Sequence, residues 1–223
     1  MKDIDAIEVV ADQTAGSRPD EGFLRVRRLV VRNRYPDGST SAHYECDMVS
    51  RKHVDAVAVL LYEITEAGEV RVALKAGVRP PVYFRRDKQF FQPDDRIYRL
   101  LPETVAGMLE PEDTGPEGIE RRAAAECFEE AGVRVAPADV EPLGGPLFAS
   151  PGITDEKVFF RSVRARLDDR VEPQGDGSVM EEAGGVIVLS MEDAIARCRD
   201  GRIPDAKTEI ALLRLRDRLR AEA

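Results

Sequence analysis

Residues 123–133 constrain the fold most, because they combine strong helix formers, three closely spaced acids and an abrupt stop. The leading alanines favour a helix, and Gly132 is a natural C-terminal end for one. Glu126, Glu129 and Glu130 lie at i, i+3 and i+4, so a helix places them on one face. Like charges near the C-terminal end destabilise a helix, and a cation between them would remove that cost. Hard oxygen ligands suit Mg²⁺ or Mn²⁺, whereas a solvated acidic face is the alternative interpretation.

These acids belong to a longer pattern. Glu117 precedes Glu126 by nine positions, and the apolar Val133 follows Gly132. The spacing resembles the Nudix box, which runs Gly, five residues, Glu, seven residues, Arg-Glu, an apolar residue, any residue, Glu-Glu, any residue, Gly and an apolar residue. Just upstream, residues 103–110 (Glu-Thr-Val-Ala-Gly-Met-Leu-Glu) resemble the strand and loop that open the box in the ADP-ribose pyrophosphatase branch.

Two features depart from that family pattern. Nine residues follow Gly107 before the first glutamate of the box, where the family has five, which places a four-residue insertion at Pro111–Thr114. Ala125 stands where the family has an arginine that orients a glutamate of the box. Arg121 and Arg122, one turn earlier on the expected helix, are the candidates to replace that arginine.

The resemblance implies a metal site on the expected helix. The carboxylates of Glu126, Glu129 and Glu130, together with the carbonyl of Ala106, would bind Mg²⁺, with Mn²⁺ as the alternative ion. Glu129 is also a predicted catalytic residue, either as a ligand or because it orients its neighbours. The backbone would approach a ligand closely at Gly107, in a tight turn formed with Ala106.

A loop supplies the predicted general base. Residues 150–156, Ser-Pro-Gly-Ile-Thr-Asp-Glu, form a loop because of their Pro and Gly. They resemble the loop that lies over the diphosphate in the ADP-ribose pyrophosphatase branch. Glu156 is accordingly the favoured general base for the attacking water, and Asp155 is the competing candidate.

Arginine is the expected ligand for the substrate phosphates. Arg79 ends a strand just before two prolines, as in the resembling branch, and a guanidinium is permanently charged and bidentate. A surface arginine at a strand end is the alternative interpretation. The predicted substrate-binding set also contains Arg51, Glu103 and Gly107.

Charge and cysteine usage limit the partners and the compartment. The formal net charge is −9, which argues against a nucleic-acid surface and requires metal ions or local arginines to attract phosphates. The three cysteines are widely spaced and typical of reduced thiols in a cytoplasmic protein. The N-terminus has no apolar signal region, and no segment approaches the roughly 20 apolar residues that span a bilayer. We therefore expect no membrane partner.

The order of elements predicts an α+β fold, a Nudix-type α/β/α sandwich with a mixed sheet and a small N-terminal antiparallel β module. The module would comprise residues 1–50 and the hydrolase domain residues 51–223. Strands are expected at 24–31, 39–49, 54–64, 70–76, 133–135, 140–148, 158–167 and 185–189, and helices at 116–131, from Ser190, and at 205–219. Residues 1–20 and the acidic stretch 168–185, which contains Glu181 and Glu182, are expected to be irregular.

The N-terminal module contains a strand, a turn at Tyr35–Gly38 and a returning strand. A lone hairpin is marginal in water, so it must dock on another surface. In the resembling branch such a module packs across a homodimer, and we expect a homodimer here. The arginine-rich strand face is either a phosphate contact or a solvated surface.

The resemblance implies hydrolysis of the diphosphate of a nucleoside diphosphate sugar in the presence of Mg²⁺. ADP-ribose, cleaved to AMP and ribose 5-phosphate, is the best single expectation. GDP-mannose and other ADP-sugars are alternatives within the same branch. A non-catalytic module that binds a nucleotide sugar is the alternative of a different class, because Ala125 and the inserted loop depart from the box.

Overall fold

A computed structural model of the chain describes residues 18, 21–175 and 183–222. The predicted irregular N-terminus, apart from a single residue, lies outside the described residues. So do Glu181 and Glu182, together with the rest of residues 176–182 in the predicted acidic loop. Within the described residues, no helix has the length and apolar character needed to cross a membrane.

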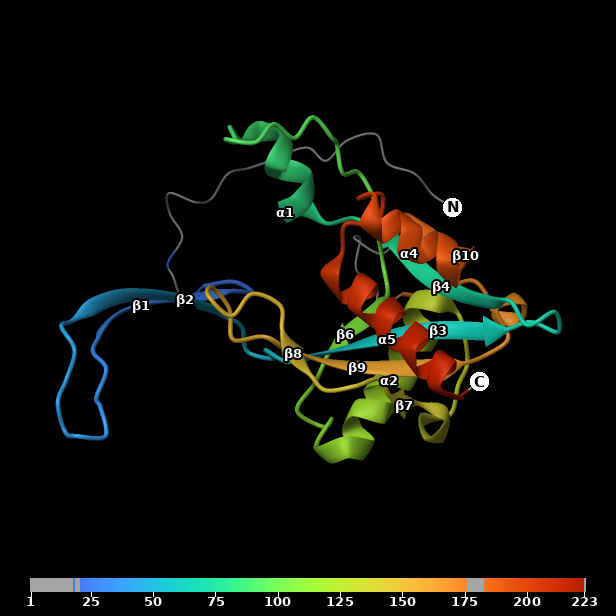
Figure 1. Cartoon of the computed structure of the whole chain (residues 1–223), viewed down its shortest axis with the longest axis horizontal. Coiled ribbons are helices and arrows are strands. Elements are labelled where there is room, and N and C mark those ends of the chain that lie inside the picture. Colours follow the sequence, from blue (N-terminus) through green and yellow to red (C-terminus); the bar gives the residue numbers. More distant parts are fainter. Residues whose placement is uncertain (1–17, 19–20, 176–182, 223) are drawn as a thin grey trace.

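An eight-stranded mixed sheet forms the centre of the molecule (Figure 1). Its central strand β3 pairs in parallel with β9 and antiparallel with β4 and β6. The sheet continues from β4 to β10 and β5, and from β9 to the short β7 and β8. The strands are β3 (Ala56–Ile64), β4 (Val70–Gly77), β5 (Leu101–Glu103), β6 (Val105–Met108), β7 (Glu141–Pro142), β8 (Leu147–Phe148), β9 (Lys157–Arg164) and β10 (Gly185–Ser190).

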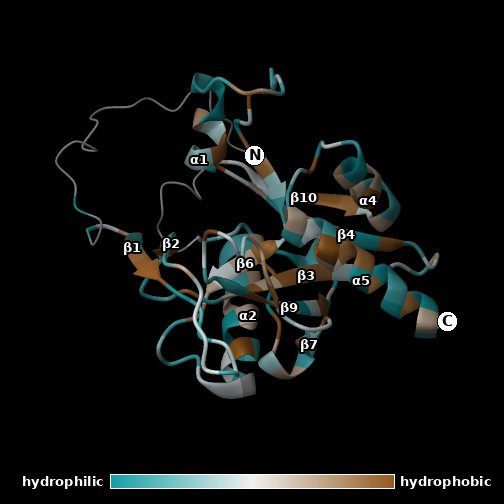
Figure 2. Ribbon diagram, turned by 60° about the vertical axis from the view of Figure 1, so that its left-hand side comes forward, coloured by the Kyte–Doolittle hydropathy of each residue, from teal (hydrophilic) through white to brown (hydrophobic). Residues whose placement is uncertain are grey.

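Helices cover both faces of this sheet. The 17-residue helix α2 (Gly115–Ala131) packs on one face, and α4 (Met191–Arg199) and α5 (Ala206–Glu222) pack on the other. Figure 2 shows hydrophobic residues concentrated in the central strands between these helical layers. The predicted α/β/α sandwich with a mixed sheet is therefore confirmed.

Strand β3 illustrates why the sheet lies in the core. Its first seven residues are all buried, which fits a β-branched, apolar run with side chains on both faces of the sheet. Val57, Val59 and Leu61 point to the α2 side, whereas Leu60 and Tyr62 point to the side of α4 and α5. The alternation divides the core into two clusters, one under each helical layer.

β5 pairs with β4, whereas the next strand, β6, pairs with β3. The candidate site described below lies where the chain passes from one partner strand to the other. β5 pairs with the end of β4, so that Lys75 lies opposite Glu103. One residue later, β6 pairs with the start of β3, where Gly107 lies opposite Val57. β4 pairs with the other half of β3, so β4 and β6 lie along different halves of the same strand. The prediction of a turn at Ala106–Gly107 is wrong, because both residues lie inside β6.

The N-terminal hairpin forms a separate two-stranded sheet of β1 (Arg25–Val31) and β2 (Tyr44–Ser50), which extends to one side in Figure 1. The predicted turn is present, with the Gly38 amide donating to the Tyr35 carbonyl over 3.0 Å. The returning strand begins at Tyr44 and not at residue 39. Asn33 and Ser41 explain the late start, because their hydrogen bonds close a wide loop in place of a regular ladder.

Two further strand predictions fail after α2. Residues 133–135 form no strand, because the Val133 amide donates to the Cys127 carbonyl in the helix C-cap while Gly132 adopts φ 68°. Residues 140–148 contain only β7 and β8, two residues each, since the chain bends at Gly144, where φ is 81°. The remaining elements are short: α1 (Pro80–Tyr83) and the 3₁₀ turns at Phe84–Asp87, Pro137–Asp139 and Leu167–Asp169.

The helix predictions are confirmed. Helix α2 begins one residue before the expected start and ends at Ala131, as expected. The Ser190 side chain caps α4 by accepting from the Asp193 amide over 3.2 Å. Helix α5 extends beyond the expected end to Glu222.

Candidate active site

Two of the three clustered acids of α2 lie against β6. Glu126 and Glu130, one helical turn apart, are both buried, with 9% and 7% of their surfaces exposed. A Cβ placed on Gly107 would lie 1.7 Å from Glu126 Oε1, so the carboxylate lies directly against the glycine backbone. Only glycine leaves room for Glu126 in this position.

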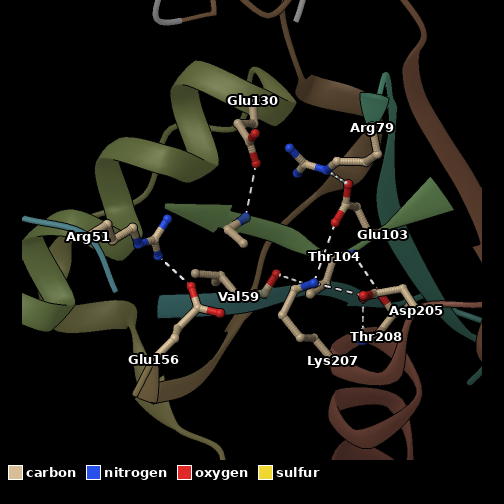
Figure 3. Close-up of polar contacts among 11 residues, drawn as sticks. Arg51, Val59, Arg79, Glu103, Thr104, Glu130, Glu156, Asp205, Lys207 and Thr208 are labelled. Atoms are coloured by element: carbon tan, nitrogen blue, oxygen red, sulfur yellow. Dashed lines mark hydrogen bonds and ion pairs between the residues drawn. The ribbon is translucent and has the colours of Figure 1, made fainter. Parts of the chain in front are cut away.

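Glu130 bridges the gap between β4 and β6. Its Oε1 forms an ion pair with Lys75 Nζ at 2.8 Å, and its Oε2 accepts a hydrogen bond from the Ala106 amide at 2.9 Å. Figure 3 shows Glu130 and the dashed line that marks the second of these contacts. The ammonium of Lys75, itself only 8% exposed, offsets the buried negative charge near the helix end.

The Ala106 carbonyl lies on the same strand edge as this amide. The Ala106 amide bonds to Glu130 and not to β3, so Ala106 and its partner Ala58 form a pair that exchanges no backbone hydrogen bonds. In a strand the amide and the carbonyl of one residue point to the same side. The Ala106 carbonyl is therefore directed away from β3, toward the edge that faces Glu130.

Arg122 takes the position next to Glu126 that Ala125 cannot fill. Its Nη1 lies 3.7 Å from Glu126 Oε1, and its Nε donates to Asp113 Oδ2 over 2.8 Å. Arg121 instead lies 3.9 Å from the exposed Glu117. Of the two candidate replacements, Arg122 is the one that contacts an acid of the box.

Asp113 belongs to the four-residue insertion, which packs tightly on the start of α2. Its carboxylate also accepts from the Glu110 amide over 2.9 Å. Burial works to raise the pKa of Asp113, but this hydrogen bond and the Arg122 guanidinium hold it below its usual value. The insertion therefore supplies the anion that orients Arg122.

Glu129 does not share the contacts that Glu126 and Glu130 make with β6. It is half-buried, and among the described residues its carboxylate has no hydrogen bond or ion pair, while its backbone carbonyl accepts from the Gly175 amide. Within the same residues, no group of three or more His, Cys, Asp or Glu side chains is arranged to hold a metal ion. The structure thus brings two of the predicted acidic ligands, Glu126 and Glu130, to the β6 edge.

A second carboxylate holds the predicted phosphate ligand Arg79. Glu103, only 4% exposed, accepts from Arg79 Nε over 2.5 Å, and its other oxygen lies 3.5 Å from Lys207 Nζ. Burial works to lower the pKa of Arg79, but the charge and hydrogen bond of Glu103 raise it above its ordinary value. Glu103 thus contacts Arg79 directly, and Figure 3 shows the terminal nitrogens of the guanidinium turned away from it.

The loop that contains Glu156 lies at the same end of the sheet. Ala56, the first residue of β3, is flanked by Met108 of β6 and Val158 of β9, so Glu156 and Gly107 both lie close to this end. The Glu156 carboxylate accepts a short hydrogen bond from Arg51, which also donates to the Val54 carbonyl over 3.2 Å. Arg51 therefore contacts the predicted general base in this structure.

The end of β2 holds the same loop in place. The Val49 amide donates to the Ile153 carbonyl over 2.8 Å, and Ser50 Oγ donates to Asp155 Oδ2 over 3.0 Å. Asp155, the competing candidate for the general base, is thus engaged by the hairpin. The N-terminal hairpin consequently reaches the candidate site through its last residues.

Four contributors were not predicted from the sequence: Lys75, Asp113, Lys207 and Asp205, whose Oδ1 lies 2.7 Å from Lys207 Nζ. A detectable signal existed for Lys75, because a lysine inside an otherwise apolar strand requires an anionic partner. The other contributors lie on loops or at a helix start, where a charged residue is ordinary. Their roles depend on contacts between residues far apart in the sequence.

Comparisons with known proteins agree with this fold. No model of a known protein family matches the chain. It is 30% identical over 158 residues to a GDP-mannose pyrophosphatase of Pectobacterium atrosepticum, a match that covers 71% of this chain and 70% of that protein. A protein of the same name from Yersinia enterocolitica is 35% identical over 113 residues, which cover 51% of this chain and 54% of that relative.

A solved structure supports the fold independently. The crystal structure of an ADP compounds hydrolase matches 91% of this chain and 95% of its own, with a TM-score of 0.58 and 14% sequence identity. At that identity the likeness establishes the architecture, which is that of a Nudix hydrolase. Together with the longer sequence match, it shows that the chain belongs to the Nudix superfamily, in the ADP-ribose pyrophosphatase-like branch.

Proposed function

We propose that this protein is a metal-dependent pyrophosphatase that hydrolyses the diphosphate of a nucleoside diphosphate sugar. The observation that carries this proposal is the convergence of two carboxylates on β6, Glu126 at Gly107 and Glu130 at Ala106. It occurs in a chain whose relatives are named GDP-mannose pyrophosphatases. A buried pair of box carboxylates beside a strand edge is costly to fold, so a binding role accounts for it better than surface solvation does.

The residues present fit a hard divalent cation, Mg²⁺ or Mn²⁺. Glu126, Glu130 and the Ala106 carbonyl present only oxygen donors to one edge of β6, and Glu129 lies next to Glu130 on the same helix. A bound cation would neutralise the diphosphate oxygens and lower the pKa of an attached water. In this structure the ammonium of Lys75 balances the negative charge of Glu130. A bound cation next to Glu130 would have the same sign of charge.

The remaining residues would bind the substrate and move a proton. Arg79, held by Glu103 through Nε, would direct its terminal nitrogens to the diphosphate oxygens. Glu156 would accept the proton of the attacking water, while the oxygen of that water bonds to phosphorus and the anhydride bond breaks. Arg51 would hold the Glu156 carboxylate in place before substrate arrives, and Arg122 would do the same for Glu126.

The names of the relatives favour GDP-mannose as the first substrate to test. Its hydrolysis would give GMP and mannose 1-phosphate. ADP-ribose, which would give AMP and ribose 5-phosphate, is the second candidate, and it agrees with the name of the structural neighbour. The two candidates differ in base and sugar, so a screen of both with Mg²⁺ and detection of the nucleoside monophosphate separates them.

A Glu130→Gln variant tests the catalytic proposal. An enzyme should lose at least about 10²-fold in rate, given what a metal site contributes. A non-catalytic module would show no hydrolysis in either form and would retain binding of the nucleotide sugar in calorimetry. Glu117→Gln is the matched control, because Glu117 is on the same helix and is exposed. Hydrolysis of nucleoside triphosphates alone would overturn the proposed substrate class.

We also propose that the chain works as a cytoplasmic homodimer in which residues 1–50 form the interface module. Val30 and Phe23 in and beside the hairpin are 70% and 62% exposed, and a two-stranded sheet is marginal without a covering surface. Cys46, Cys127 and Cys198 are free thiols, which supports the proposed compartment. Sedimentation equilibrium of the wild type and of a Val30→Asp variant tests the interface: a monomeric wild type would contradict it.

A further inference from the structure

The start of α5 forms a largely buried polar network with Thr104, the residue that links β5 to β6 (Figure 3). Thr208, which is fully buried, accepts from the Thr104 amide over 2.7 Å through its hydroxyl oxygen. The same hydroxyl donates to Asp205 Oδ2 over 2.7 Å. Thr104 in turn donates through its own hydroxyl to the Val59 carbonyl of β3. The start of α5 is thereby joined to the centre of the sheet.

A charged branch of this network reaches Glu103. Asp205 Oδ1 lies 2.7 Å from Lys207 Nζ, and that ammonium lies 3.5 Å from Glu103 Oε2. Burial works to lower the pKa of Lys207, but the charges of Asp205 and Glu103 raise it above its usual value. Lys207 is therefore a cation held between two carboxylates, one at the residue that precedes α5 and one on β5.

Glu103 consequently has one cation on each oxygen. Lys207 lies at Oε2, and Arg79 Nε lies 2.5 Å from Oε1. A carboxylate fixed from both sides can hold the Arg79 side chain in one orientation, although 42% of that side chain is exposed. Because an unrestrained arginine loses rotamer entropy when it is immobilised, a guanidinium held in advance binds an anion at lower cost.

We propose that Asp205 is a positioning residue for the pyrophosphatase site: it holds Lys207 against Glu103, and Glu103 orients Arg79 toward the substrate diphosphate. The inference rests on the proposed function for its substrate, but the chain of contacts exists independently of it. The class of ligand that this unit prepares the site for is a diphosphate, which offers oxygens to a bidentate guanidinium.

A purely structural role for Asp205 is the competing explanation, because Asp205 also caps α5. Its Oδ2 accepts from the Thr208 amide over 2.9 Å. The two roles use different properties of the side chain. Asparagine caps a helix about as well as aspartate, so Asp205→Asn keeps the cap and removes the charge that attracts Lys207. Asp205→Ala removes both.

The experiment measures kcat and KM for GDP-mannose and ADP-ribose with Mg²⁺ in Asp205→Asn, Asp205→Ala and Lys207→Met. The positioning role predicts that Asp205→Asn lowers kcat/KM about 10-fold, mainly through KM, with a melting temperature close to wild type. Asp200→Asn is the matched control, since Asp200 pairs with Arg202 at the surface, and it should behave as wild type. An Asp205→Asn enzyme with unchanged kcat/KM would overturn the positioning role and show that Asp205 serves only to cap α5.

A double mutant shows whether the effect passes through Glu103. If Asp205 acts by way of Glu103, then Asp205→Asn should change kcat/KM little in a Glu103→Gln background. An undiminished 10-fold loss in that background would overturn the proposed route. If the Asp205 or Glu103 variants fold poorly, Lys207→Met tests the same route. It removes the ammonium that connects Asp205 to Glu103 and leaves both carboxylates in place.

A readout without turnover separates this inference from the proposed function. The Arg79 Nε–H group, hydrogen-bonded to Glu103, should give a slowly exchanging signal in ¹⁵N NMR of the wild type. Asp205→Asn should accelerate its exchange, whereas Asp200→Asn should not. Failure of the wild type to hydrolyse any nucleotide sugar would refute the proposed function, while an unchanged Arg79 signal in Asp205→Asn would refute the positioning network.

Discussion

The two sides of the candidate site are built differently. On the helix side, Glu126 and Glu130 come from a 17-residue helix, are at most 9% exposed, and contact the backbone of β6 directly. On the loop side, 29% of the Glu156 side chain is exposed, and the loop before it is held by the end of β2. The helix side is therefore part of the core, whereas the loop side depends on the N-terminal hairpin.

This difference indicates a division of labour. Groups that must hold a multiply charged ion at fixed spacing benefit from a rigid, packed element, because errors of about 1 Å are costly. A general base over the substrate must admit and release that substrate, so a loop position suits it. Changes on the helix side should therefore affect activity and stability together, and changes on the loop side should affect mainly activity.

The largest effect is expected for Gly107→Ala. The added Cβ would lie 1.7 Å from Glu126 Oε1, so the carboxylate must move away from β6. We expect a loss of about 10²-fold in kcat with the fold retained, because a flexible side chain can shift. Gly145→Ala, where a Cβ meets nothing within 4 Å, is the control in the same assay. A Gly107→Ala enzyme with normal kcat would show that Glu126 is misplaced in this account.

On the loop side, Arg51→Gln should reduce kcat about 10-fold, because Glu156 loses the group that holds its carboxylate. Stability should change by less than about 1 kcal/mol, as is usual for a partly exposed ion pair. Steady-state kinetics and thermal unfolding of the same preparation provide the comparison. If the variant lost stability and kept its kcat, the loop side would be structural and the contrast between the two sides would fail.

On the helix side, Asp113→Asn should reduce the free energy of unfolding by an amount that depends on pH. The folded-state pKa of Asp113 is lowered, so its charge stabilises the fold above the unfolded value near 4, and that contribution is lost as pH falls through the folded pKa. The variant should therefore lose about 1–2 kcal/mol at pH 7 and approach the wild type in strong acid. Urea unfolding from pH 7 down to pH 3 measures this, and a difference that stays constant with pH would contradict it.

The smallest effect concerns the reactivity of the thiols, because the thiol of the hairpin is less buried than the two thiols of the core. Burial raises the pKa of Cys127, helped by Glu126 and Glu130, and burial likewise raises the pKa of Cys198 to about 11. Both thiols should therefore react slowly with a disulfide reagent at pH 8, because the thiolate is the nucleophile. Cys46 on β2 is only half-buried and should react first. Fast modification of Cys127 in the native protein would show that α2 opens readily.

Local signals in the sequence predicted much of the fold. Gly132 ends α2 and Ser190 caps α4 as expected, because each depends on a few adjacent residues. The strand predicted at 133–135 is wrong because the C-cap of α2 takes the amide of Val133, which apolar periodicity does not reveal. β-Strand propensity is a weak guide wherever tertiary contacts claim the backbone.

The sequence indicated which residues to consider for the site, but not which side chains contact one another within it. The spacing of the box indicated Glu126 and Glu130, and Arg122 was one of two candidates for the missing arginine. The contact of Glu130 with Lys75 spans 55 positions, and the contact of Thr104 with Thr208 spans 104. Such contacts arise only when the sheet and helices pack, so a single sequence does not identify which residue the partner is.

Binding of Mn²⁺, followed by electron paramagnetic resonance, tests the central claim most directly, because it needs neither substrate nor turnover. The wild type should bind Mn²⁺, and Glu126→Gln and Glu130→Gln should each weaken binding by at least about tenfold, as expected when a charged ligand is lost. Glu117→Gln, on the same helix, should bind as the wild type does. Equal Mn²⁺ affinity in all four proteins would contradict the account.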